Sequence, residues 1–259
     1  SRDIEHHLLI MHDLPWFSAS SILLLSLWIS CSPERADELP SVMPISHVAK
    51  DCPATMEDAD GNVYPVVQIG KHCWMADNLR TTTYANGVSI LDPVAQPGQW
   101  VTLQEGMQSG YGIENNPVNG RLYNYLAVRD ARGICPSGWH VATDDEWSEM
   151  VLELDPRADP YISGNQSTTE GALLKQRWSW ESNDSASNWS GFGALPAGRR
   201  LPDGSFDAFG SEGWWWTATA LEAEAKAWSR SMFHDNGHVD RGLDVYRHGF
   251  CVRCVQDED

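Results

Sequence analysis

Short apolar runs separated by turn dipeptides are the feature that most constrains how this chain folds. Turn signals occur at Asp60-Gly61-Asn62, Gly70-Lys71, Asn86-Gly87 and Asp203-Gly204. Glycine and asparagine readily adopt the positive φ angles that two-residue hairpin turns require. The run between the first two signals alternates apolar side chains at Val63, Val67 and Ile69. The pattern therefore predicts many short antiparallel strands rather than long helices.

The clearest helix signal begins at Thr143. Thr143-Asp144-Asp145-Glu146 is a capping box, in which the Thr hydroxyl and the Glu carboxylate each bind a backbone amide of the other residue. Apolar side chains then recur at helical spacing, and a proline ends the pattern. These positions are Trp147, Met150, Val151, Leu154 and Pro156. One amphipathic helix is therefore predicted from residue 144.

Two other segments carry weaker helical patterns. A second helix is predicted over residues 169–177, with Thr168 or Thr169 as its cap and Leu173 and Leu174 on the buried side. Residues 120–132 fit either a strand or a short helix, and their spacing favours a helix. The rest of the chain reads as strands, including WWWTATA (214–220), AKAWSRSMF (225–233) and a terminal strand HGFCVRCV (248–255). Few helices and many strands predict an α+β fold.

The N-terminal segment has the pattern of an export signal. SILLLSLWIS (21–30) is an apolar run of signal-peptide length, and a small residue precedes Cys31, as in the cleavage box of bacterial lipoproteins. Simple secretion and a buried N-terminal helix are the alternatives. The prolines and charges that follow are typical of a tether. The predicted organisation is a signal peptide (1–30), a tether lipidated at Cys31 (31–51) and a folded domain (52–259).

The charge balance restricts the partners of this chain. Its net charge is −18, with 18 basic against 36 acidic residues and no basic run. Nucleic acid is therefore not expected as a partner, because a phosphate-binding surface needs clustered Lys and Arg. The membrane is expected to be reached only through the N-terminal lipid. The 13 tryptophans supply flat apolar faces, for a core or for a binding surface.

Five blocks in order carry a family resemblance. They are DADGNVYPVVQIGKHCWMADNLRTT, GRLYNYLAVRDARGICPSGWHVATDDEW, SGFGALPAGRR, GWWWTATA and GFCVRCV. Together they resemble the Fibrobacter succinogenes major paralogous domain family over residues 52–257. This resemblance implies a bacterial protein of the outer membrane or cell surface, lipid-anchored or secreted. CPSGWHV, GWWWTAT and GFCVRC also resemble the C-type-lectin-like fold, which lectins, adhesins and formylglycine-generating enzymes share.

The cysteines of an exported chain are expected to oxidise. Cys52 and Cys73 flank the first hairpin, and we expect them to form a disulfide worth about 3 kcal/mol in the chain-entropy model. The C-type-lectin-like resemblance implies a second disulfide, Cys135–Cys254, and leaves Cys251 over. A direct Cys251–Cys254 bridge is disfavoured, because residues three apart on a strand point to opposite faces. Neither a helix N-terminus nor a second cysteine pair accompanies them, as redox or zinc chemistry would require.

No cofactor is expected. Asp58, Asp60 and Asn62 start like a calcium loop, but the position of the final ligand holds Ile69, so a turn is the preferred interpretation. Calcium elsewhere stays open, because loop residues 114–116 and 181–188 carry oxygen ligands. The sugar-binding calcium signatures of C-type lectins are absent, and no catalytic motif occurs. An enzyme is therefore not expected.

Candidate ligand-binding residues lie in three segments. The first offers indole faces with amide and hydroxyl donors, the usual chemistry of sugar recognition, although a packed loop in a Trp-rich core is the alternative. It comprises Trp178, Trp180, Asn183, Asp184, Asn188 and Trp189. The second is Trp215, within a strand whose side chains alternate faces. The third is a polar stretch near the C-terminus, where the resemblance places ligand contacts: Asp235, Asn236, His238, Asp240, Arg241 and Tyr246.

These features favour a surface-anchored, non-catalytic binding or adhesion domain whose partner is a glycan or a surface protein. Two alternatives remain. One is a copper or thiol oxidase-like enzyme using Cys251 and Cys254, as implied by the resemblance to formylglycine-generating enzymes. The other is a structural coat or assembly subunit.

Overall fold

Two antiparallel sheets form the framework of the protein, in a computed structural model that describes residues 51–93, 98–102, 104–112, 119–182 and 185–258. All of these belong to one compact unit, Ile45–Asp259. Cys31, the signal peptide and most of the tether lie outside the described residues. Among the described residues, no helix is both long and apolar enough to cross a membrane.

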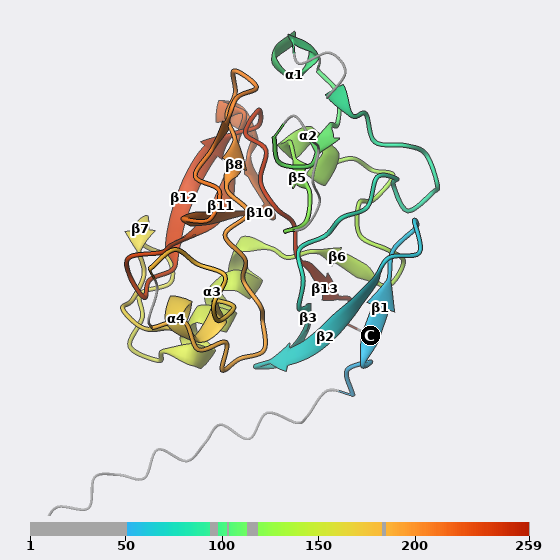
Figure 1. Cartoon of the computed structure of the whole chain (residues 1–259). Coiled ribbons are helices and arrows are strands. Elements are labelled where there is room, and N and C mark those ends of the chain that lie inside the picture. Colours follow the sequence, from blue (N-terminus) through green and yellow to red (C-terminus); the bar gives the residue numbers. More distant parts are fainter. Residues whose placement is uncertain (1–50, 94–97, 103, 113–118, 183–184, 259) are drawn as a thin grey trace, which may run out of the picture. The chain divides into compact units, whose positions relative to one another are not determined.

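The first sheet joins the start of the folded domain to its end. Its order is β1 (Thr55–Glu57), β2 (Val63–Ile69), β3 (His72–Met75), β13 (Cys254–Gln256) and β6 (Trp139–Val141). The predicted turns at residues 60–62 and 70–71 connect β1 to β2 and β2 to β3 as antiparallel hairpins. In Figure 1, β13 lies between β3 and β6, so the last strand closes the sheet that the first hairpin opens.

The second sheet consists mainly of the predicted tryptophan-rich strands. Its order is β10 (Glu212–Leu221), β11 (Lys226–Phe233), β12 (Asp240–Val245) and β7 (Gly164–Asn165). A 3-10 turn, η2 (Glu222–Glu224), connects β10 to β11. Two short pairs complete the strands: β4 (Gln108–Ser109) with β5 (Leu122–Tyr123), and β8 (Arg199–Arg200) with β9 (Phe206–Asp207). The Asp203-Gly204 turn connects β8 to β9, whereas Asn86-Gly87 closes only a single bridge, Thr83 with Ser89.

Helix α3 (Asp144–Leu154) confirms the strongest sequence signal. Thr143 accepts a hydrogen bond from the Glu146 amide, and Glu146 accepts one from the Thr143 amide, so both halves of the capping box form. Trp147, Met150 and Val151 are buried and pack into the core that α3 shares with β10. The apolar stripe therefore faces the sheet as its spacing predicts.

The other helices are shorter than the sequence predicts. Helix α4 is only Glu170–Leu174, because Lys175 leaves the helix in an extended conformation and bridges Ala194. Segment 120–132 is not one helix: it forms β5 and then α2 (Tyr125–Val128). Asn124 separates them, because its side-chain oxygen Oδ1 accepts hydrogen bonds from the Met107 and Ala127 amides. A further helix, α1, spans Gly98–Thr102.

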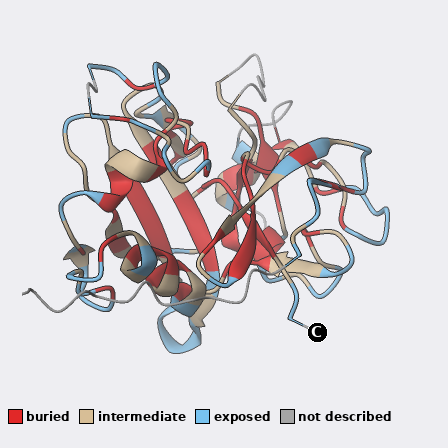
Figure 2. Ribbon diagram, turned by 90° about the horizontal axis from the view of Figure 1, so that it is seen from below, coloured by how far each residue is buried: buried red, intermediate tan, exposed pale blue. Residues whose placement is uncertain are grey.

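The predicted terminal strand is divided into an extended link and β13. Residues 249, 250 and 251 make single bridges to Arg200, Tyr123 and Trp215, and regular pairing begins only at Cys254. This link joins the tryptophan strand β10 to the first sheet. Figure 2 shows buried residues along the strands of both sheets and exposed residues mainly in the loops.

Both expected disulfides are present. Cys52 and Cys73 have Cα atoms 5.6 Å apart, and Cys135 and Cys254 have Cα atoms 6.0 Å apart. Cys251 is a free, buried thiol. The protein is α+β with mainly β structure.

Candidate functional site: an indole loop beside an acidic groove

Two exposed tryptophans lie on one loop, residues 176–190, which we call the indole loop. Trp178 is 90% exposed and Trp189 is 77% exposed. These are the largest exposed fractions among the exposed large hydrophobic side chains of the described residues. Asn183 and Asp184, which the sequence places in the same site, lie outside the described residues. The loop thus presents two indole faces to solvent.

Asn188 holds the two ends of the indole loop together. Its side-chain Nδ2 donates to Gln176 Oε1 at 2.9 Å, and its side-chain Oδ1 accepts from the Gly193 amide at 2.8 Å. Gln176 lies two residues before Trp178, and Asn188 is the residue before Trp189. Asn188 was predicted as a ligand-binding residue, and the structure gives it these internal partners.

The backbone of the indole loop is strained. Trp178, Ser182 and Asn188 have φ angles of 67°, 48° and 50°, in the left-handed region that favours glycine. Only two other non-glycine residues among those described share this region. Such strain concentrates at ligand clamps and active sites, because surrounding structure must maintain it. Trp178 thus combines a bulky side chain, a positive φ and a 90% exposed surface.

Trp180 is an anchor of the loop and not a binding platform, which corrects the sequence-based expectation. It is only 6% exposed, and its indole N–H donates to the Ala194 carbonyl at 2.9 Å. The Lys175 ammonium lies 5.0 Å from its ring centroid. For this residue the packed-core alternative is correct, because neighbouring segments cover both the ring and its polar atom.

Trp215 is also removed from the candidates. Its side chain is fully buried, and its N–H donates to Asn78 Oδ1 at 2.7 Å. The predicted alternation of faces does hold, since Trp216 packs in one hydrophobic cluster and Trp215 in the other. Because both faces of β10 are covered, neither ring reaches solvent.

The six polar residues near the C-terminus do not form one binding face. Arg241 is buried and paired with Asp144, with 2.6 Å between Nη2 and Oδ2. Tyr246 stacks on Tyr125 beyond the far end of β12, with ring centroids 4.6 Å apart. The remaining four residues, Asp235, Asn236, His238 and Asp240, lie in the β11–β12 turn and at the start of β12.

Within that turn, polar groups mainly bind one another or the backbone. Asn236 accepts from the His238 amide and donates to Asp235 Oδ1, each at 3.0 Å. The backbone carbonyl of Asn236 accepts from the buried Lys175 ammonium at 2.5 Å. Burial lowers the pKa of Lys175 to about 8. The turn is therefore braced from inside by Lys175.

A groove that the sequence did not indicate lies between the β2–β3 turn and the C-terminal half of α3. One pocket of about 300 Å3 opens there, and a second of about 290 Å3 lies beside it. Both are lined by Ile69, Gly70 and Glu153, so they form one groove, which we call the α3 groove. The second pocket is also lined by Trp189, which places an exposed indole at one end of the groove.

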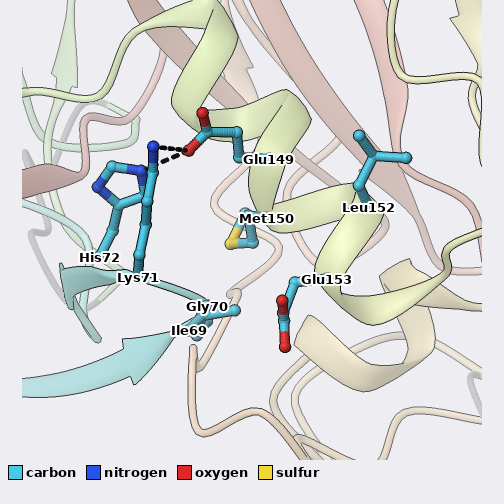
Figure 3. Close-up of a pocket in the computed structure, with 8 residues that line it drawn as sticks. All are labelled: Ile69, Gly70, Lys71, His72, Glu149, Met150, Leu152 and Glu153. Carbon is cyan, nitrogen blue, oxygen red and sulfur yellow. Dashed lines mark hydrogen bonds and ion pairs between the residues drawn. The ribbon is translucent and has the colours of Figure 1, made fainter. Parts of the chain in front are cut away.

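Charged groups occupy the other end of the α3 groove (Figure 3). The Glu149 carboxylate lies 3.1 Å from Lys71 Nζ and 2.7 Å from His72 Nε2. Met150 and Leu152 add apolar surface from the helix. The available sequence signal was the composition of α3, DDEWSEMVLEL, which has acidic but no basic side chains. What the sequence could not show is that the β2–β3 turn faces this helix.

A larger hollow of about 730 Å3 lies on a different part of the surface. Both of its arginines form ion pairs, Arg132 with Asp130 at 2.7 Å and Arg129 with Glu222 at 2.8 Å. Among the described residues, no cluster of three or more His, Cys, Asp or Glu side chains is arranged to hold a metal ion. Residues 114–116, which carried part of the calcium expectation, lie outside the described residues.

The calcium-like start at residues 58–62 is a turn, as preferred from the sequence. Asp58 Oδ1 accepts from the Asp60 and Asn62 amides, and Asp60 accepts from the Thr82 and Thr83 hydroxyls. The carboxylates are thus used in internal hydrogen bonds that attach the hairpin to the following segment.

Comparison with known protein families shows to which family the chain belongs. A family model, the Fibrobacter succinogenes major domain, matches residues 67–256. The chain belongs to this family. The match covers most of the described structure, including the indole loop, the α3 groove and the Cys135–Cys254 disulfide, so the Fibrobacter succinogenes major domain contains every element of the site. Comparisons with curated proteins and with solved structures gave no match.

Proposed function

We propose that this protein is a non-catalytic binding domain, exported to the bacterial cell surface, that recognises a glycan through the indole loop. Attachment through a lipid on Cys31, or secretion, gives it access to extracellular ligands. A C-type-lectin-like arrangement is part of the proposal. It is supported by the Cys135–Cys254 disulfide, which that resemblance implied, and by the closing strand β13, which lies between β3 and β6 in the first sheet.

Trp178 carries the proposal. Its indole is 90% exposed although its backbone adopts a left-handed conformation that costs on the order of 1–3 kcal/mol. A core residue gains burial in return for such strain, but this ring gains almost none. Trp189, on the same loop, is also largely exposed. Flat indole faces with hydrogen-bonding groups nearby suit the apolar faces and hydroxyl groups of sugar rings.

The oxidase-like alternative has less support. It needs two free thiols at Cys251 and Cys254, but Cys254 is bonded to Cys135. Burial raises the pKa of Cys251 to about 12, which keeps it as a protonated thiol. No specific observation favours a coat or assembly subunit, and native mass spectrometry of the purified chain would reveal one as a polymer.

A glycan array with matched variants tests the proposal. We expect the wild-type chain to be retained on a subset of glycans. Trp178→Ala should lower that retention about tenfold or more, as the loss of an aromatic hot spot does. Tyr161→Ala is the control, because Tyr161 is an exposed aromatic residue (56%) outside the loop and its loss should leave retention unchanged. Retention on no glycan, together with tight capture of a protein partner, would contradict the proposal.

A further inference from the structure

Arg177 places an exposed positive charge beside the exposed indole of Trp178. Its guanidinium carbon lies 5.2 Å from the centroid of the Trp178 ring, which is within the range of cation–π attraction. Successive side chains of an extended segment point to opposite faces. The left-handed backbone at Trp178, with a φ of 67°, breaks that alternation. Two neighbouring residues therefore present an indole and a charge side by side.

The guanidinium of Arg177 has no carboxylate partner among the described residues. Within that part of the chain it also donates no hydrogen bond, and its side chain contacts the Trp178 ring. Other arginines with exposed or partly exposed side chains form ion pairs with Asp or Glu, namely Arg129, Arg132, Arg157 and Arg199. A guanidinium stacked on a ring keeps its in-plane N–H donors free, and their fork matches the two oxygens of a carboxylate.

Two anchors fix the segment that carries this pair. Before it, the Gln176 amide donates to the Ala194 carbonyl at 2.9 Å. After it, the buried indole of Trp180 donates to the same Ala194 carbonyl, also at 2.9 Å. Arg177 and Trp178 therefore lie between two fixed residues, and a ligand has less of the segment to order when it binds.

Glu181 is the one acidic side chain among the described residues of the indole loop. Its amide donates to the Gly210 carbonyl at 3.0 Å, and a Cβ atom on Gly210 would lie 3.1 Å from Glu181 Oε1. The carboxylate thus lies against the turn between β9 and β10 and forms no ion pair with Arg177. The net charge of −18 repels anions at long range, but salt screens that repulsion beyond about 8 Å at physiological ionic strength.

We propose that the indole loop binds a glycan that contains uronic acids. One sugar ring stacks on Trp178, and the carboxylate of the same or an adjoining sugar binds Arg177. The inference rests on the proposed glycan-binding function and names the class of glycan. An indole face suits the apolar side of a sugar ring, and the guanidinium selects rings that carry a carboxylate. Because both side chains are exposed, the carboxylate should add about fivefold to the affinity.

Uronic-acid oligomers and their methyl esters are matched probes, because esterification removes the charge and keeps the sugar skeleton. Oligomers of galacturonic, glucuronic and mannuronic acid, all of equal length, cover different stereochemistries. Calorimetry with the full chain is done at about pH 6, where carboxyl groups are ionised, and at about 0.15 M salt. We expect at least one acid form to bind about fivefold more tightly than its ester.

Matched variants locate the charge. Arg177→Gln should abolish the preference for the acid form and leave the affinity for the ester unchanged. Arg177→Lys keeps the charge without the planar fork and should keep part of the preference. Arg247→Gln is the control, because Arg247 is also exposed and lacks a carboxylate partner among the described residues; it should leave the preference unchanged. Circular dichroism of each variant checks that the fold is retained.

The outcomes separate the inference from the proposed function. Equal binding of acid and ester forms by the wild type would overturn the uronic-acid inference and leave glycan binding intact, as would retention of neutral glycans alone on the array. A preference that persists in Arg177→Gln would also overturn it. Failure of every probe, with no glycan retained on the array, would overturn both. Tetraglutamate bound as tightly as the acid oligomer would show general recognition of anions and would overturn the uronic-acid inference.

Discussion

Asn188 and Gln176 join the two ends of the indole loop through a side-chain hydrogen bond of 2.9 Å. Asn188 also accepts from the Gly193 amide and has a φ of 50°. It therefore meets two requirements of this position: it tolerates a left-handed backbone better than most residues, and it closes the loop by hydrogen bonds.

Substituting Asn188 tests both requirements. Asn188→Ala should lower the free energy of unfolding by about 2 kcal/mol, because it removes two hydrogen bonds worth about 1 kcal/mol each. Asn188→Gly removes the same bonds but relieves the positive φ, so it should cost about 1 kcal/mol less than the alanine variant. Urea denaturation measures both values. Equal losses would show that backbone strain at this residue contributes nothing.

Asp144 should be among the most sensitive positions for stability. It binds two buried guanidinium groups, Arg230 and Arg241, each with a closest distance of 2.6 Å. Asp144→Asn leaves those charges without a full counter-charge and should cost about 3–5 kcal/mol. Asp145→Asn is the matched control, since Asp145 is exposed and next in sequence, and should change stability by less than about 0.5 kcal/mol. Similar losses in the two variants would contradict a special role for the buried pairs.

His140 should make stability fall at alkaline pH. Its hydrogen bond to Glu146, reinforced by Asp257, raises the pKa of His140 from 6.5 to about 9. The folded-state pKa is the higher one, so this contribution is complete below about pH 6.5 and is lost as the pH rises through about 9. The side chain is 37% exposed, which limits the effect to about 1 kcal/mol after solvent screening.

Urea denaturation of the wild type and His140→Gln, at about pH 6 and about pH 10, measures this contribution. The stability difference between the two proteins should shrink at the higher pH. A difference that stays constant would show that the ion pairs of His140 do not stabilise the fold.

Cys251 should be unreactive in the native protein. It is fully buried, and burial raises its pKa to about 12, so almost no thiolate exists at neutral pH. Iodoacetamide should label Cys251 only after denaturation, as read by peptide mass spectrometry. Cys135 and Cys254 should be labelled only after denaturation and reduction. Rapid native labelling of either Cys251 or Cys254 would restore the thiol-oxidase alternative.

Local sequence patterns predicted the elements whose cause is local. The capping box at Thr143, the hairpin turns at residues 60–62 and 70–71, and the Cys52–Cys73 disulfide depend on residues close in the chain. The prediction of a single helix over residues 120–132 was wrong, because the contacts that shape this segment come from distant parts of the chain. Tyr123 pairs with Phe250, and Asn124 binds the Met107 amide.

The candidate site shows the same division. Sequence composition singled out the loop that carries Trp178, Trp180 and Trp189, but all three have the same kind of side chain. Which ring is exposed depends on what packs against it, and for Trp180 that is the Ala194 carbonyl and the Lys175 ammonium. Composition cannot supply this information, because burial is a property of tertiary contacts.

The sequence by itself determined the family, the α+β class with mainly β structure, the main helix and the cysteine partners. The existence of the α3 groove became evident only from the tertiary structure. Its floor comes from the turn at Gly70, its wall from α3 and its end from Trp189, three segments that are far apart along the chain. They meet because the buried face of α3 and the first sheet share one core, in which Trp147 packs on Trp74 with ring centroids 5.4 Å apart. Hydrophobic burial brings the segments together, and their exposed edges then form a groove that no single segment encodes.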